Sequence, residues 1–169
     1  MMQTVPRVPP LDRPATYDDL VKLPDHVVAE IVNGELHASP RPAPRHAVTG
    51  SIIGGRDVLV PDLAGWRRAR MPALPSTAYF PLAPDWVCEI LSPSTASLDR
   101  AKKMSIYARE KVAHAWLIDP IAGTFEVLRL EGGRWTVIAT HTGDEVVRAE
   151  PFVEVELDLR SLWAGSTDG

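Results

Sequence analysis

The sequence has a single cysteine, no long apolar run and no excess of basic residues. One cysteine excludes an intramolecular disulfide and a cysteine-based zinc site. Because Cys88 stands in the apolar run WVCEIL, we expect a small buried core residue rather than a reactive thiol. No stretch approaches the roughly 20 apolar residues that span a bilayer. The first residues, MMQTVPRVPPLDRP, show no apolar run behind their charges, so we expect no signal peptide and a cytoplasmic location.

The size and composition are those of one ordinary domain. The chain has 169 residues, of which 45% are apolar and 24% charged, and its mean hydropathy is -0.06. This balance excludes a disordered acidic protein and is enough for a real core. We expect a flexible proline-rich arm over residues 1–15, one domain over residues 16–164 and a short tail over residues 165–169.

The charge is distributed unevenly along the chain. Residues 1–140 carry 16 basic and 15 acidic side chains, whereas residues 141–169 carry 2 and 7, and the net charge is -4. Nothing here forms a general surface for a polyanion. Any contact with a nucleic acid would therefore be local and weak.

The first half predicts a short helix and a hairpin. Thr16, followed by acidic residues, is typical of a helix N-cap, and this helix is expected to end near Pro24. Asn33-Gly34, at the centre of the β-rich residues 27–38, predicts a two-residue hairpin turn. Residues 45–53 could start a helix, although the glycines at and after them leave it little room.

The second half predicts a mixed sheet crossed by one long helix. Its apolar and alternating segments are expected as strands at residues 57–63, 86–91, 114–118, 124–130, 134–140 and 155–159, with a hairpin turn at Gly132-Gly133. Residues 98–111 are the most strongly predicted helix, because Met104, Tyr107 and Ala108 are spaced to form one buried face. The predicted fold class is α+β, with a long helix joining neighbouring strands.

Three polar residues stand where folding alone would not place them. Asp62 follows Pro61 at a break in a strand, Glu89 lies inside an apolar strand, and Lys103 stands beside the buried stripe of the long helix. Two carboxylates on adjacent strands could hold Mg²⁺ or Mn²⁺ for attack on a phosphodiester, with the lysine orienting water or stabilising charge. Lys103 and Tyr107 share a helical face. Equally, Glu89 and Lys103 could form a buried salt bridge, and Asp62 could cap a turn.

Other polar residues have a simpler interpretation. Glu30 and Glu35, on either side of the first hairpin turn, are more often solvent-facing charges, with a supporting role in a metal site as the alternative. His46 is expected to be a polar loop residue.

Several segments together resemble the Uma-type restriction endonucleases, a family of the PD-(D/E)xK nuclease superfamily. They are AEIVNGEL, SPRPAPRH, VLVPDLAGWR, WVCEILSPST, DRAKKMSIYARE, AWLIDP and FEVLRLEGGRW. The resemblance implies a restriction-endonuclease-like mixed sheet flanked by helices, with N-terminal and C-terminal hairpins.

The same resemblance implies roles for individual residues. Asp62 would be the aspartate of the PD element, Glu89 the acid of the (D/E)xK element, and the carbonyl of Ile90 a further metal ligand. Leu91 stands where the superfamily's lysine would be, and the lysine moves to the following helix as Lys103, or less readily Lys102. Glu30 matches an acidic position near the site.

One departure concerns the connection from His46 to Asp62, which is short for the family. The first core helix would be truncated and a core strand lost, which would leave an unpaired sheet edge or a gap that a homodimer fills. The chain would then be a natural deletion or a degenerate copy.

The leading functional hypothesis is a Mg²⁺-dependent endonuclease that hydrolyses DNA. A catalytically degenerate binding or assembly module is the alternative, and a hydrolase of another phosphate ester is a third. No helix-turn-helix or zinc-finger motif indicates how DNA would be recognised. The basic residues that could contact phosphates are Arg67, Arg68, Arg70, Arg100 and Lys102.

Overall fold

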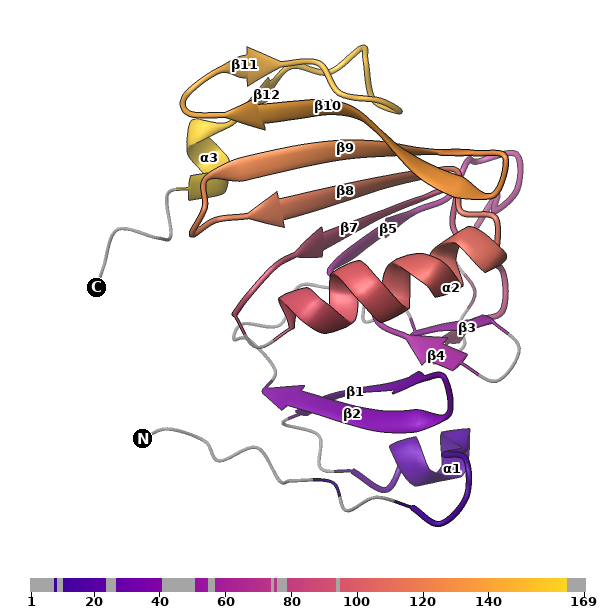
Figure 1. Cartoon of the computed structure of the whole chain (residues 1–169). Helices are drawn as coiled ribbons and strands as arrows, with labels where there is room; N and C mark the ends of the chain where they lie inside the picture. Colours follow the sequence, from indigo (N-terminus) through magenta and orange to yellow (C-terminus); the bar gives the residue numbers. More distant parts are fainter. Residues whose placement is uncertain are drawn as a thin grey trace. The chain divides into compact units, whose positions relative to one another are not determined.

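The computed structural model describes two compact units, each with its own sheet (Figure 1). The described residues are 8, 11–23, 27–40, 51–54, 57–73, 75, 79–93 and 95–163. The first unit comprises Met1–Pro61 and Leu74–Ala83, and the second comprises Asp62–Ala73 and Pro84–Gly169. The single domain expected over residues 16–164 stays a prediction. His46 and the tail over residues 165–169 lie outside the described residues, as does most of the arm.

The first unit contains the predicted hairpin. Strands β1 (Val27–Val32) and β2 (Glu35–Pro40) pair antiparallel across a turn in which Asn33 has φ 52° and Gly34 has φ 79°. Two consecutive residues with positive φ are what a tight hairpin turn requires, and Asn-Gly meets that requirement with little strain. The hairpin prediction is therefore confirmed.

A short helix, α1 (Tyr17–Leu20), precedes this hairpin as predicted. Its N-cap is Thr16, whose backbone N–H donates a hydrogen bond of 2.9 Å to the carboxylate of Asp19. The acid in the first turn thus satisfies a donor that the helix leaves open. The helix ends at Leu20, one turn earlier than expected, and Pro24 itself lies outside the described residues.

The predicted helix over residues 45–53 is wrong where the structure describes it. Residues Ser51–Gly54 form strand β3, which pairs antiparallel with β4 (Asp57–Leu59) and parallel with β6 (Tyr79–Phe80). The β-branched pair Ile52 and Ile53 between glycines favours an extended chain, and pairing on both sides decides it. The first sheet has the order β2-β1-β4-β3-β6.

The second unit is built on a five-stranded mixed sheet of order β10-β9-β8-β7-β5. Its strands are β5 (Leu63–Gly65), β7 (Trp86–Ile90), β8 (His114–Asp119), β9 (Thr124–Glu131) and β10 (Arg134–Thr142). β7 and β8 are parallel, and the other pairs are antiparallel. Strands β7 to β10 agree with the sequence prediction, including the hairpin turn at Gly132-Gly133. The single strand expected over residues 57–63 is wrong, because β4 ends at Leu59 in the first sheet and β5 begins at Leu63 in the second.

One helical segment joins the parallel strands β7 and β8, as predicted. It begins with a wide π-type turn, η1 (Leu98–Lys103), and continues as α2 (Met104–Arg109). The indole N–H of Trp135, in β10, donates a hydrogen bond of 2.7 Å to the carbonyl of Met104. This bond ties the helix to one face of the sheet.

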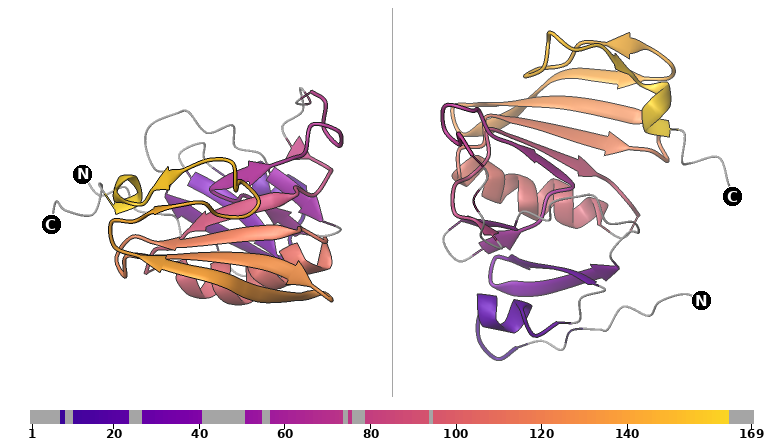
Figure 2. Two further views of the ribbon diagram at one scale, coloured as in Figure 1. Left: turned by 90° about the horizontal axis from the view of Figure 1, so that it is seen from above. Right: turned by 180° about the vertical axis from the view of Figure 1, so that it is seen from behind.

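The C-terminal segment packs on the other face (Figure 2). It contains β11 (Val146–Val147), β12 (Leu157–Asp158) and the short helix α3 (Arg160–Trp163). Because side chains alternate along a strand, Trp86 and Cys88 point toward this segment, whereas Val87 and Glu89 point toward the helix. The shared core on the C-terminal side comprises Trp86, Cys88, Ile118, Phe125, Val127, Val147, Ala149 and Leu159. Cys88 is fully buried, as expected.

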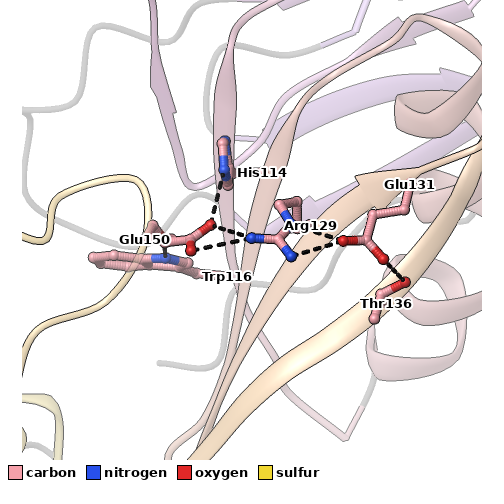
Figure 3. Close-up of polar contacts among 6 residues, drawn as sticks. All are labelled: His114, Trp116, Arg129, Glu131, Thr136 and Glu150. Carbon is pink, nitrogen blue, oxygen red and sulfur yellow. Dashed lines mark hydrogen bonds and ion pairs between the residues drawn. The ribbon is translucent and has the colours of Figure 1, made fainter.

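Glu150 fastens the C-terminal segment to the sheet (Figure 3). Its main-chain oxygen accepts a hydrogen bond of 2.6 Å from the indole N–H of Trp116. Its carboxylate lies 3.2 Å from Nη1 of Arg129 and 3.4 Å from Nε2 of His114. Arg129 also pairs with Glu131 at 2.7 Å. Residues from β8, β9 and the C-terminal segment thus form one polar network.

Within the described part of the chain, no helix has the length and apolar character needed to cross a bilayer.

Candidate active site

Glu89 is a buried carboxylate in the middle of the second unit. It lies in β7, whose other residues Trp86, Val87 and Cys88 are all buried, and only 2% of Glu89 is exposed. A carboxylate removed from water to this extent must be compensated by hydrogen bonds or opposite charge. Its side chain faces the helix, so the compensation comes from there.

Lys103 and Tyr107 supply that compensation. Nζ of Lys103 lies 2.8 Å from Oε1 of Glu89, and the hydroxyl of Tyr107 donates a hydrogen bond of 2.5 Å to the same oxygen. Both residues are buried, and their spacing of four places them on one face of the helix. The structure therefore brings together the acid, the lysine and the tyrosine that the sequence singled out.

The surroundings shift the proton affinity of Glu89. Burial is the largest cause and raises the pKa of Glu89 to about 8. The positive charge of Lys103 opposes this rise, and the negative charge of Asp99 adds to it.

Asp99 is a buried acid of this cluster that the sequence analysis did not single out. Only 4% of it is exposed, and its Oδ1 lies 3.3 Å from Nζ of Lys103. An acid in the first turn of a helix is common and usually exposed, so its position alone does not indicate a buried site. Its spacing of four from Lys103 was the one signal that could have identified it.

Asp62 contacts β7 from the start of the neighbouring strand β5. It immediately precedes β5, which pairs antiparallel with β7 so that Leu63 faces Cys88. Extending this register by one residue places Asp62 opposite Glu89. Oδ2 of Asp62 accepts a hydrogen bond of 2.7 Å from the backbone N–H of Ile90. The two acids of the predicted site are therefore carried on neighbouring strands.

The thiol of Cys88 lies close enough to both acids for their charges to affect its pKa. Burial raises the pKa of its thiol, and the negative charges of Glu89 and Asp62 add to this effect. The thiol is thus inert, because the thiolate is the reactive form.

These residues fit a hard divalent cation. Asp62 and Glu89 would offer carboxyl oxygens, and Ile90, at the end of β7, would offer a backbone carbonyl. Mg²⁺ is commonly bound through one or two carboxylates and several waters, so two acids are sufficient. Among the residues that the structure describes, no three His, Cys, Asp or Glu side chains form a metal cluster. A metal held here would therefore depend on the carbonyl and on water.

Two of the arginines predicted to contact nucleic acid are paired with an acid. Nε of Arg67 lies 2.8 Å and Nη1 of Arg70 lies 3.0 Å from Oδ1 of Asp85. Burial raises the pKa of Asp85, but the hydrogen bonds from Arg67 and Arg70 outweigh it and leave the pKa below its usual value. These two contacts join the loop that follows β5 to Asp85, just before β7.

The other basic candidates lie on the loop and the helix. Nη1 of Arg100 lies 2.6 Å from Oε2 of Glu126. Arg68 is exposed, and within the described residues it makes no ion pair. Lys102 is half-buried beside Lys103.

Glu30 and Glu35 lie in the first unit. Glu30 is 8% exposed, and its Oε1 accepts a hydrogen bond of 2.7 Å from the backbone N–H of Val60. Glu35, in β2, lies 3.6 Å from Nε2 of His37. Glu30 is thus buried rather than solvent-facing, because it satisfies a backbone donor next to β4. A supporting role in a metal site stays a prediction for both residues.

Comparisons with known proteins identify the family and the fold of the chain. The family model Uma2, described as "Putative restriction endonuclease", matches residues 48–160. The crystal structure of a putative nuclease belonging to DUF820, from Anabaena variabilis, matches with a TM-score of 0.68 and 23% sequence identity. The match covers 89% of this chain and 98% of that chain, so the predicted α+β restriction-endonuclease-like fold is confirmed. Among curated proteins, none matches the chain.

Proposed function

The chain belongs to the Uma2 family, and on that premise we propose that it is a metal-dependent endonuclease that hydrolyses phosphodiester bonds in DNA. One observation carries the proposal. Lys103 contacts Glu89 at 2.8 Å, while Asp62 stands in register opposite Glu89 and bonds the next residue of its strand. Two acids on one strand pair, with a lysine from the helical segment η1 against one of them, are groups suited to metal-dependent phosphodiester hydrolysis.

Asp62, Glu89 and the carbonyl of Ile90 would hold Mg²⁺ or Mn²⁺. Such an ion supplies a nucleophilic water at neutral pH and offsets the charge of the phosphate. Within the protein, the hydrogen bond from Ile90 holds Asp62, and those from Tyr107 and Lys103 hold Glu89. Ligands that are held before the substrate arrives need little reorganisation.

Lys103 would act on the reacting groups rather than on the ion. Its ammonium is buried next to Glu89, and a fixed positive charge in a site of low dielectric strongly favours developing negative charge. It can also donate a hydrogen bond that orients water. This role makes Lys103, and not the half-buried Lys102, the lysine of the site.

Binding of DNA would be weak and sensitive to salt. Three of the candidate arginines already share carboxylates, Arg67 and Arg70 with Asp85 and Arg100 with Glu126. Positive charge that is offset in this way releases few counterions on binding. Arg68, exposed on the loop, is the strongest candidate for a direct phosphate contact.

The first experiment is a calorimetric titration of Mn²⁺ into the purified protein, because it needs no choice of substrate. We expect saturable binding that is lost in Asp62→Asn and in Glu89→Gln. Glu154→Gln, which removes an exposed acid of the same unit, is the matched control and should bind as the wild type does. Binding that survives both site substitutions would reject this metal site.

A non-catalytic module is the second candidate. The observation in its favour is that Oε1 of Glu89 is already engaged by both Lys103 and Tyr107, as in a purely structural ion pair. A folded wild-type protein that binds no Mn²⁺, alone or with an oligonucleotide present, would favour it.

A further inference from the structure

Three ionisable side chains from the helical segment and β7 are buried together. Asp99, Lys103 and Glu89 are 4%, 2% and 2% exposed. The ammonium of Lys103 lies between two carboxylates, 2.8 Å from Glu89 and 3.3 Å from Asp99. One cation is thus shared by two acids, and only one of these acids belongs to the proposed metal site.

The sharing changes what Glu89 can do. If Lys103 were paired with Glu89 alone, the two charges would cancel, and a neutralised carboxylate attracts a divalent cation poorly. Asp99 also contacts the ammonium, so Lys103 is shared between two carboxyl groups and is not paired with Glu89 alone. Glu89, on the strand next to Asp62, is therefore less fully neutralised by Lys103.

The helix geometry holds Asp99 in this position. Asp99 and Lys103 are four residues apart on one turn of η1, so they share a face of the helix. The backbone N–H of Asp99 donates to the carbonyl of Thr95 at 2.9 Å, which anchors the start of the turn. Wide helical turns of this kind occur often at functional sites.

We propose that Asp99 is a positioning residue of the metal site: it takes a share of the ammonium of Lys103 and so keeps Glu89 able to bind a divalent cation. This inference rests on the proposed function. Asp99 itself does not touch the ion, and its whole effect passes through Lys103. The structure thereby distinguishes it from Asp62 and Glu89, which would be ligands.

A double-mutant cycle on Mn²⁺ affinity tests the proposal. Four proteins are titrated by calorimetry: the wild type, Asp99→Asn, Lys103→Met and the double variant. Asp99→Asn should weaken Mn²⁺ binding by at least about tenfold, the lower end of losses for groups that act on metal ligands indirectly. In the Lys103→Met background the same change should have less than about a threefold effect, because the cation that Asp99 shares is gone.

Two further variants separate charge from packing. Asp99→Glu keeps a carboxylate within reach of Lys103 and should retain most of the affinity, so it also tests the proposal if Asp99→Asn does not fold. Glu126→Gln removes an acid of the same unit that pairs with Arg100 instead, and should leave binding unchanged.

Each result has a distinct meaning. An equal loss for Asp99→Asn with and without Lys103 would overturn the positioning role, as would a loss in Asp99→Glu as large as that in Asp99→Asn. Wild-type affinity in Asp99→Asn would overturn it while the metal site stands. Absence of Mn²⁺ binding by the folded wild type would reject the proposed function, and this inference with it.

Discussion

Oδ2 of Asp62 accepts a hydrogen bond of 2.7 Å from the backbone N–H of Ile90, the residue that follows Glu89. This bond joins the two halves of the candidate site at the edge of the β5–β7 pair. An aspartate that caps a neighbouring strand in this way has a fixed carboxylate. The alternative expectation, that Asp62 merely caps the turn after Pro61, would not require any contact with β7.

Substitutions at Asp62 should separate its structural contact from its proposed role as a ligand. Asparagine can still accept the hydrogen bond from Ile90, so Asp62→Asn should leave the free energy of unfolding nearly unchanged. Asp62→Ala leaves that N–H without its acceptor and should cost about 1 kcal/mol. Both should abolish Mn²⁺ binding. Urea denaturation and calorimetry measure the two effects, and Mn²⁺ binding by Asp62→Asn at wild-type affinity would contradict the assignment.

Lys103→Met should lower the rate of metal-dependent DNA cleavage by at least about a hundredfold, as loss of a group that stabilises the transition state does. Mn²⁺ binding should persist, because the lysine is not a ligand. Lys102→Met is the comparison on the same helix and should lower the rate far less, since it could weaken only a phosphate contact. A plasmid-nicking assay with Mn²⁺ checks both variants, and a larger loss in Lys102→Met would show that the wrong lysine was chosen.

Tyr107→Phe should destabilise the protein by about 1–3 kcal/mol. It removes only a hydroxyl, but that hydroxyl is buried and donates to the carboxylate of Glu89. Ser105→Ala is the control on the same helix, since it removes a hydroxyl whose hydrogen bond to the carbonyl of Lys102 is exposed. Chemical denaturation measures both. A cost for Tyr107→Phe no greater than that for Ser105→Ala would mean that the hydrogen bond contributes nothing net.

The network on the opposite face of the sheet should respond to acid (Figure 3). Hydrogen bonds from Arg129 and then Thr136 lower the pKa of Glu131 below its ordinary value. A carboxyl with a lowered folded-state pKa adds stability above its unfolded-state pKa and loses it as the pH falls through the folded value. The stability difference between the wild type and Glu131→Gln should therefore be largest near about pH 7 and shrink toward about pH 3. A difference that does not change over this range in urea denaturation would contradict this account.

Local structure in this protein was largely predictable from the sequence. The turns at Asn33-Gly34 and Gly132-Gly133 need positive φ, which those residues adopt with little strain, so both hairpins followed from a few neighbouring residues. The strand containing Glu89 was recognisable because a short, almost continuously apolar run is typical of a strand that is covered on both faces. The spacing of Lys103 and Tyr107 placed both on one face of the helix before any contact was known.

The sequence by itself thus determined the hairpins, the buried strand and the helix that carries the lysine, because backbone preference and side-chain period act within a few residues. Only the tertiary structure decided that residues 51–54 are a strand, that Asp99 shares the charge of Lys103, and that Asp85 holds two arginines expected to face DNA. These outcomes depend on which segments become neighbours. Strand register and helix packing set those neighbours, and they are decided by the whole core rather than by any one segment.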